Sequence, residues 1–148
     1  MKWLLDTNVV SETAKRRPNA GVVDWLAKQR PDELAVSMIT VAELRMGAFA
    51  RIDAERRREL MQWIETTVGT WLADRCLTVT VEILTDWLWL ARQLAAKRIT
   101  RQAPDLLLAA PARIHHLTIV TRNVRDFADT GVVVYDPWAG KTHAMDAP

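Results

Sequence analysis

Residues 2–8 read KWLLDTN, a short apolar run that ends in a polar triplet. An apolar run of this length is consistent with a buried β-strand. Asp6 then stands at the carboxyl end of that strand, where open α/β sheets place their ligand crevice. The opening of the chain therefore predicts a strand of a buried sheet, and it marks the edge at which a functional site is expected.

The rest of the chain alternates between strand and helix patterns. Further strands are expected at residues 34–37, 77–80, 117–121 and 132–135, and helices at residues 19–30, 40–50, 53–75 and 82–98. Another helix opens at Pro104-Asp105. Such alternation predicts a parallel sheet covered by helices on both faces. The 148 residues fit one domain, which we expect to span residues 1–140, with residues 141–148 as a C-terminal tail.

Composition excludes several classes of protein. With 20 Lys and Arg against 18 Asp and Glu, the net charge is +2, and 49% of the residues are apolar, which excludes a disordered chain. The longest uncharged stretch, Leu34 to Ala42, has 9 residues, whereas a membrane span needs roughly 18. Lys2 precedes a short apolar run, so no signal peptide is expected. The single Cys76 excludes an internal disulfide and a Cys/His zinc site. We therefore expect an intracellular, cytoplasmic protein.

Clusters of basic residues give weak support for a nucleic-acid partner. They are Lys15-Arg16-Arg17, residues 56–58, Lys97-Arg98 with Arg101, and Arg122 with Arg125. Grooves that follow a phosphate backbone need such clusters, because each neutralised phosphate releases counterions. Solvated helix faces carry the same residues. Residues 56–58, which lie among acidic residues, fit the solvated face better, and both interpretations stay open for the others.

Acidic residues stand at the ends of several predicted elements. Asp6 follows the first strand, Glu43 lies one turn into a helix, Asp105 opens a helix, and Asp126 lies in the loop after the strand at 117–121. A carboxylate among aliphatic residues costs several kcal/mol to bury without a partner. Each acid alone is more often structural, and Asp105 suits a helix start. Together, the four residues are expected to converge on one oxygen-lined pocket, which suits Mg²⁺ or Mn²⁺.

Four stretches of the sequence carry a resemblance to a known family. Residues 4–12 (LLDTNVVSE) resemble the opening strand and turn of PIN-domain ribonucleases, and residues 37–47 (SMITVAELRMG) resemble their second motif. Within residues 104–110 (PDLLLAA), the initial PD and the final LAA resemble the third motif. Residues 120–127 (VTRNVRDF), continued by residues 136–138 (DPW), resemble the closing motif of the VapC-type toxins, especially the FitB-like branch. The motifs keep the family's order and spacing over nearly the whole chain.

This resemblance implies a fold, an activity and a set of partners. The fold would be a three-layer α/β/α sandwich with a central parallel sheet. The protein would be a Mg²⁺-dependent endoribonuclease, with Mn²⁺ as the alternative ion, which cleaves RNA and acts as the toxin of a toxin–antitoxin module. It would pair with a cognate antitoxin protein and assemble as a homodimer or a larger complex, away from membranes. By position, Asp6, Glu43 and Asp105 match the family's three catalytic, metal-binding acids. Asp126 is assigned as the fourth, with Asn123 as an uncharged alternative.

The chemistry of phosphodiester hydrolysis assigns roles to these residues. A carboxylate-held Mg²⁺ supplies a nucleophile at neutral pH and compensates charge in the transition state. Asp6 and Asp105 are predicted to bind the ion directly, whereas Glu43 and Asp126 bind through water or orient the attacking water as a base. The side chains expected to orient these carboxylates are Thr7, Asn8, Thr40 and Thr121. Thr7 equally suits the N-cap of the next helix, and Arg45 and Arg122 suit either phosphate contacts or the surface.

Two other classes of function share parts of this pattern. A phosphatase with an aspartyl nucleophile also begins with a strand that ends in Asp, but it needs a second Asp two residues later. That position is Asn8 here, and an amide cannot transfer the proton. A catalytically degenerate PIN-like module, which binds an antitoxin or nucleic acid without cleavage, stays open because of Asn123 and Pro111.

Pro111 departs from the family pattern, which usually has a small or hydroxyl residue at this position. In a helix from Pro104 to about His115, Pro111 loses its hydrogen bond to Leu107 and clashes with that carbonyl. Such a defect costs roughly 3 kcal/mol. The helix is therefore expected to bend or to end early near residues 107–111.

Overall fold

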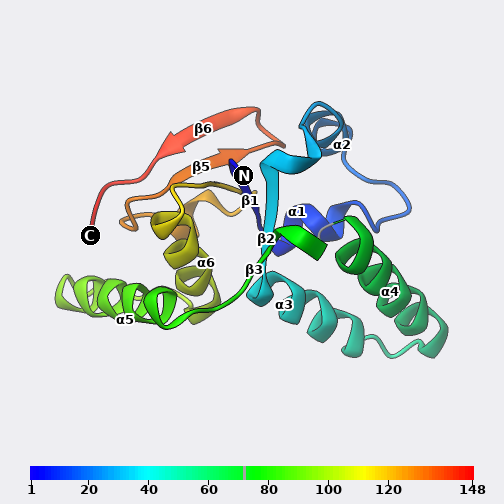
Figure 1. Ribbon diagram of the computed structural model, residues 1–148, viewed down its shortest axis with the longest axis horizontal. Helices are drawn as coiled ribbons and strands as arrows, with labels where there is room; N and C mark the ends of the chain where they lie inside the picture. The colour runs from blue at the N-terminus through cyan, green and yellow to red at the C-terminus, as the bar shows by residue number, and fades with distance from the viewer. Residues whose placement is uncertain (72) are drawn as a thin grey trace.

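The computed structural model describes residues 1–71 and 73–148, and one six-stranded sheet lies at its centre (Figure 1). The strands are β1 (Trp3–Leu5), β2 (Leu34–Ser37), β3 (Cys76–Leu77), β4 (Thr118–Val120), β5 (Val133–Asp136) and β6 (Lys141–Ala144). Their order across the sheet is β3-β2-β1-β4-β5-β6. All neighbouring strands pair in parallel except β5 and β6, which are antiparallel. The first strand of the chain therefore lies in the middle of the sheet.

Helices cover both faces of this sheet. They are α1 (Thr7–Glu12), α2 (Ala20–Ala27), α3 (Met38–Phe49), α4 (Ala54–Thr66), α5 (Val81–Ala96) and α6 (Ala103–Ile114). Buried side chains of α1 to α4 form a core on one face that includes Val10, Leu44 and Ile64. Buried side chains of α5 and α6 form a second core that includes Leu90 and Leu108. The predicted three-layer α/β/α sandwich is confirmed.

The central strand β1 contributes to both cores. Leu4 packs in the core under α5 and α6, whereas Leu5 packs in the opposite core, because successive side chains of a strand point to opposite faces. A strand buried on both faces has a continuous apolar sequence, as residues 3–5 do. Its register pairs Leu5 with Val120 of β4. The residues that follow these two strands, Asp6 and Thr121, therefore lie together at the carboxyl edge of the sheet.

The long helix expected from residue 53 is shorter than the sequence pattern predicted. The α-helix α4 ends at Thr66, a π-helix follows at Thr67–Trp71, and a 3₁₀ turn occupies Ala73–Arg75. Residue 72, which falls within the expected helix, lies outside the described residues. The change at Thr67 has a physical reason, because residues 66–69 hold three β-branched residues and a glycine, all of low helix propensity.

The strand expected at residues 77–80 is also misplaced. The residues that pair with β2 are Cys76 and Leu77, and Thr80 instead caps α5, its hydroxyl accepting a hydrogen bond from the backbone N–H of Ile83 (3.3 Å).

No helix among the described residues has the length and apolar character needed to cross a membrane.

The C-terminal tail expected at residues 141–148 is wrong for its first half. Lys141–Ala144 form β6, which pairs with β5 at the edge of the sheet. The intervening turn is held by Asp136, whose Oδ1 accepts a hydrogen bond from the backbone N–H of Trp138 (2.8 Å). Gly140 adopts a φ of 65°, which favours glycine. Because β6 is an edge strand with mostly exposed residues, it lacks the apolar pattern that would have predicted it.

Pro111 lies inside α6, and the helix continues through it to Ile114. The expected early end of the helix is therefore wrong, whereas the expected bend stays a prediction. Beyond the proline, the backbone N–H of His115 donates to the carbonyl of Pro111 (3.0 Å), so helical bonding resumes at once. Pro111 is buried, and the packing of α6 on the sheet offsets the lost hydrogen bond.

Replacing Pro111 by Ala is expected to raise the free energy of unfolding by about 1 kcal/mol. The substitution restores a helical hydrogen bond to Leu107, worth up to roughly 3 kcal/mol. It also removes buried ring atoms, which costs about 2 kcal/mol. Denaturation in urea measures the difference. Pro104→Ala is the control, because proline is tolerated in the first helical turn, and a Pro111→Ala protein that unfolds more easily than its parent contradicts the prediction.

Candidate active site

Asp6 is the central acidic residue of the candidate active site. It follows β1 and caps α1, with its Oδ1 accepting a hydrogen bond from the backbone N–H of Thr7 (2.6 Å). The alternative in which Thr7 caps the helix is therefore wrong. Oδ2 of Asp6 accepts hydrogen bonds from Nδ2 of Asn8 (2.6 Å) and Oγ1 of Thr121 (2.6 Å). Burial raises the pKa of Asp6, and these hydrogen bonds act against the rise because they stabilise the charged form.

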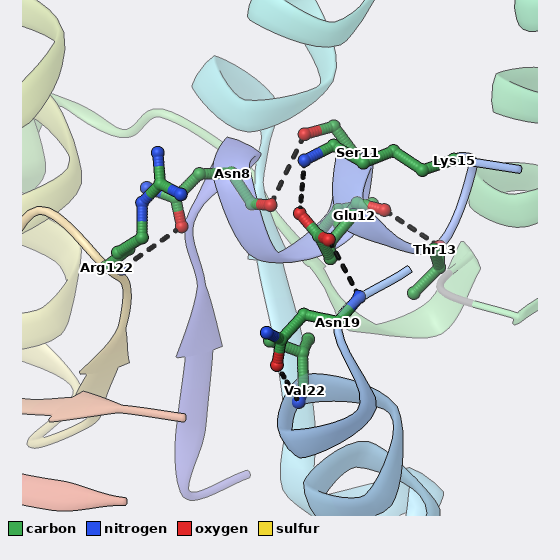
Figure 2. Close-up of polar contacts among 9 residues, drawn as sticks. Asn8, Ser11, Glu12, Thr13, Lys15, Asn19, Val22 and Arg122 are labelled. Atoms are coloured by element: carbon green, nitrogen blue, oxygen red, sulfur yellow. Dashed lines mark hydrogen bonds and ion pairs between the residues drawn. The ribbon is translucent and has the colours of Figure 1, made fainter. Parts of the chain in front are cut away.

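Thr121 connects the carboxyl ends of β1 and β4. The residue is fully buried, and its hydroxyl, which donates to Asp6, accepts from Nδ2 of Asn8 (2.8 Å) and from the backbone N–H of Asn123 (3.0 Å). Oδ1 of Asn8 in turn accepts from the backbone N–H of Arg122 (3.3 Å), as Figure 2 shows. Asn8 and Thr121 thus both hold the Asp6 carboxylate, which is the orienting role that the sequence predicted for them.

Glu43 reaches the site from the second turn of α3. The hydroxyl of Thr7 donates a hydrogen bond to Oε2 of Glu43, which directs this side chain toward α1. The negative charge of Glu43 adds to the rise in the pKa of Asp6. Thr40 had been expected to orient a carboxylate, and this expectation is wrong. Its hydroxyl instead donates a hydrogen bond to the backbone carbonyl of Leu5 (3.3 Å). That contact anchors α3 on β1.

Asp105 lies half-buried in the first turn of α6. Burial raises the pKa of Asp105 to about 6, with further contributions from the charges of Asp126, Asp6 and Glu43, while Arg101 acts in the opposite direction. Charges perturb a carboxyl group in this way only over short distances. Asp105 is therefore electrostatically coupled to the other three predicted acids.

Asn123 and Asp126 are the two candidates for the fourth position. The side chain of Asn123 is exposed, and its backbone N–H rather than its amide bonds within the site. Asp126 lies in the short 3₁₀ helix Val124–Phe127, which the fully buried Phe127 anchors in the core. The charge of Asp126 acts on Asp105. The structure thus favours Asp126, whose role as a metal ligand stays a prediction.

The donors at this edge are carboxylate oxygens, the ligands that Mg²⁺ and Mn²⁺ prefer. Within the described residues, no three Asp, Glu, His or Cys side chains lie close enough together to form a ready-made ligand set for one ion. Mg²⁺ is usually held by only one or two carboxylates and keeps several of its waters. The donor chemistry therefore fits a hydrated Mg²⁺, and it does not fit a closed structural zinc site.

Glu12 is a buried acid to which the sequence patterns assigned no role. It is 4% exposed, it pairs with Nζ of Lys15 (2.5 Å), and it accepts a hydrogen bond from the backbone N–H of Asn19 (2.9 Å) (Figure 2). The hydrogen bond from Lys15 lowers the pKa of Glu12. Asn19 also caps α2 by accepting from the backbone N–H of Val22 (3.2 Å). Glu12 therefore fixes α2 against α1. In the sequence, the only indication that Glu12 is buried was its position close to the apolar pair Val9-Val10.

The arginines considered for phosphate contacts differ in their surroundings. Arg45 is exposed and pairs with Glu65 (2.7 Å), which supports a surface role. Arg122 is exposed beside the site, with its guanidinium 5.5 Å from the centre of the Trp138 ring. Of these two residues, Arg122 is the better placed to contact a phosphate near Asp6.

Replacing Thr121 by Val is expected to destabilise the protein by about 2 kcal/mol and to weaken metal binding by roughly 10- to 100-fold. Valine has the same shape, but it removes the hydroxyl that holds Asp6 and leaves the N–H of Asn123 without an acceptor. Urea denaturation and calorimetric Mg²⁺ titration measure the two effects. Thr142→Val, the same substitution on the exposed strand β6, is the control, and equal behaviour of the two variants contradicts the prediction.

The sequence and the fold are both similar to those of known proteins. Residues 3–133 match the family model of the PIN domain. The chain is 32% identical over 135 residues to the toxin FitB of Neisseria gonorrhoeae, which covers 91% of this chain and 97% of that protein. It is 33% identical over 135 residues to the VapC ribonuclease Y4jK of Sinorhizobium fredii, which covers 91% and 96%. The crystal structure of FitAcB from Neisseria gonorrhoeae is similar with a TM-score of 0.85 at 32% identity, over 92% of this chain and 98% of that chain.

The chain belongs to the PIN-domain family. Its match to the family model includes Asp6, Glu43, Asp105 and Asp126. Within the family, the chain groups with the FitB and VapC toxins, as its four sequence motifs predicted.

Proposed function

We propose that this protein is a Mg²⁺-dependent endoribonuclease that hydrolyses RNA phosphodiester bonds as the toxin of a toxin–antitoxin pair. The observation that carries the proposal is the set of acids around Asp105, whose pKa rises to about 6 through burial and the charges of Asp126, Asp6 and Glu43. Like-charged carboxylates in one place are costly unless a cation joins them. Membership of the PIN-domain family and the likeness to a protein named VapC ribonuclease support RNA as the substrate.

The metal would be held by residues from four separate segments of the chain. Asp6 and Asp105 would bind the ion directly, and Glu43 and Asp126 would bind it through water. When bound, Mg²⁺ or Mn²⁺ supplies an acidified water and neutralises the charge that develops on the phosphate.

The chain's own contacts prepare these carboxylates before the substrate arrives. Hydrogen bonds from Thr7, Asn8 and Thr121 hold Asp6, and the Thr7 hydroxyl holds Glu43. Carboxylates that are already oriented need no rearrangement when they act.

The remaining steps are assigned to side chains at the rim of the site. A carboxylate oxygen of Glu43 or Asp126 orients the attacking water and accepts its proton. Arg122 follows Thr121 and is exposed, with its guanidinium near the Trp138 ring, and it would bind a phosphate of the substrate through charge-assisted hydrogen bonds.

The toxin role implies a protein inhibitor. The relative FitB is named as a toxin, and an enzyme that cuts cellular RNA has to be restrained in the cell that makes it. We therefore expect a small antitoxin protein to bind this chain, in a complex that holds two or more toxin copies. Co-expression with the neighbouring gene and light scattering on the purified complex measure both the pairing and the stoichiometry.

Cleavage of defined RNAs by the purified chain tests the activity. Structured and unstructured RNAs are incubated with Mg²⁺, with Mn²⁺ or with EDTA, and cleavage is expected with either metal and lost in EDTA. An Asp6→Asn protein purified in the same way controls for contaminating nucleases. If the parent neither cleaves RNA nor binds the metals, the proposal fails and the protein is a PIN-like module that binds its partners without cleavage.

A further inference from the structure

A pocket of about 270 Å³ opens beside the acidic site. It lies among α1, α3 and α4, which Figure 1 shows on the same side of the molecule. Each helix lines it with residues at helical spacing, among them Ser11 from α1, Gly47 from α3 and Trp63 from α4. Neither the sequence motifs nor the proposed chemistry uses this pocket.

The pocket shares a wall with the acidic site. Thr7 and Glu43, which are joined by the hydrogen bond from the Thr7 hydroxyl, line both. The rest of the lining is largely apolar and includes Leu44, Leu60 and Trp63. A group bound here would therefore be an immediate neighbour of a phosphate held at the acidic residues.

The size of the pocket limits what it can bind. Pockets for drug-sized ligands begin at roughly 300 Å³, so a pocket of about 270 Å³ suits one ring system rather than a larger molecule or a helix. Aliphatic walls and an indole favour a flat ring with a π face, and every nucleobase presents one.

Basic residues surround the opening of the pocket. Lys15, Arg51 and Arg56 line it, and an adjoining groove is lined by Arg16 together with the same two arginines. Lys15 pairs with Glu12 (2.5 Å), and Arg56 pairs with Glu59 (2.9 Å). The guanidinium of Arg51 has no hydrogen-bond partner among the residues that the structure describes. This charge pattern is complementary to the phosphates on either side of a bound base.

We infer that this pocket binds one unstacked nucleobase of the RNA substrate, next to the scissile phosphate, while Arg51 and its neighbours bind the flanking phosphates. The inference rests on the proposed ribonuclease function and adds a base-binding subsite to it. Single-stranded RNA supplies such a base at low cost, because no duplex has to be opened. The basic residues of the pocket and the adjoining groove favour RNA over a protein segment as the occupant.

Gly47 offers a clean way to block the pocket. A Cβ added there meets no atom within 4 Å outside its own helix, and replacing a glycine inside a helix favours folding. Gly47→Leu therefore fills the opening without disturbing the core, and Gly47→Ala is the matched control because it adds only a methyl group. Gly47 belongs to neither the acidic site nor its hydrogen-bond network.

The test compares two fluorescent probes of about ten nucleotides, an RNA oligomer and an abasic oligomer with the same sugar–phosphate backbone. Anisotropy titrations in EDTA give the affinity without cleavage. The parent and Gly47→Ala are expected to bind the base-bearing RNA about ten-fold more tightly than the abasic oligomer. Gly47→Leu is expected to bind the two equally, and Arg51→Gln to weaken both by the same factor.

Two results overturn the inference. If the parent binds both oligomers equally, no base is recognised, and a protein segment becomes the occupant of the pocket. If Gly47→Leu keeps the parent's preference for the base-bearing RNA, the base binds elsewhere. Cleavage assays on the same proteins keep this outcome separate from the proposed function, because a parent that cuts RNA with Mg²⁺ but shows no base preference refutes the subsite alone.

Discussion

An Asp6→Asn protein is expected to cleave RNA at least roughly a thousand-fold more slowly than its parent. The reason is that Asp6 is proposed to hold the metal ion, whose positive charge contributes several kcal/mol to transition-state stabilisation. The amide is nearly the same size, but it loses the negative charge that attracts the ion. It also disturbs the local network, since three donors, from Thr7, Asn8 and Thr121, converge on the present carboxylate. A single amide oxygen cannot accept from all of them.

Single-turnover cleavage with Mg²⁺ measures this loss, and calorimetric titration with Mg²⁺ measures the accompanying loss of metal binding. Asp24→Asn, in an exposed position on α2, makes the same chemical change away from the site and should leave both quantities unchanged. A rate within ten-fold of the parent would show that Asp6 is a structural helix cap and that the reaction proceeds elsewhere.

The Asp105→Asn substitution is expected to stabilise the metal-free protein near neutral pH and to abolish its stabilisation by Mg²⁺. The pKa of Asp105 in the folded chain is about 6, above the ordinary value of roughly 4. A carboxyl group with a raised pKa contributes stability that is present below about pH 4 and lost as the pH rises through 6. Asparagine carries no charge at any pH, so it escapes that loss.

The size of this effect follows from the shift in pKa. Two pKa units correspond to about 3 kcal/mol, but Asp105 is only half-buried, so screening by solvent reduces the gain to about 1 kcal/mol. At about pH 8 the metal-free variant should melt roughly 2–4 °C above the parent, and at about pH 4 the two should coincide.

Thermal melts with and without Mg²⁺ test both halves of this prediction. Added Mg²⁺ should raise the melting temperature of the parent by mass action and leave that of Asp105→Asn unchanged. Asp24→Asn is again the control. If Asp105→Asn melts below the parent at about pH 8 without metal, the carboxylate stabilises the fold and the electrostatic crowding at the site has been misjudged.

The fold was predictable where an element is buried on both sides. β1 and β4 carry short, mostly apolar runs because each contacts two cores, and those runs located both strands in the sequence. β6 pairs through its backbone at an exposed edge, so its side chains carry no such signal. The predicted length of the helix from residue 53 was wrong for another reason. The helical spacing of apolar residues continues past Thr66, but the residues that follow have low α-helix propensity.

The positions of the candidate acids along the chain were easier to predict than their contacts. Asp6 and Asp105 stand at a strand end and a helix start, which are positions that sequence patterns locate well. Asn123 is exposed whereas Asp126 is half-buried beside the fully buried Phe127, and this difference in burial could not be predicted from the sequence. The contact of Thr40 with the Leu5 carbonyl and the base-sized pocket arise from helix packing, which spacing along one segment cannot describe.

The hydrogen bond from Thr121 to Asp6 joins residues 115 positions apart, and this separation has a consequence for synthesis. While the ribosome is still making the chain, Asp6 has emerged but Thr121 has not, so the carboxylate lacks the partner that orients it. β1 likewise lacks β4 on one side. A nascent chain that ends before residue 121 therefore lacks the contact that orients Asp6, and this contact can form only when the last fifth of the protein has been made.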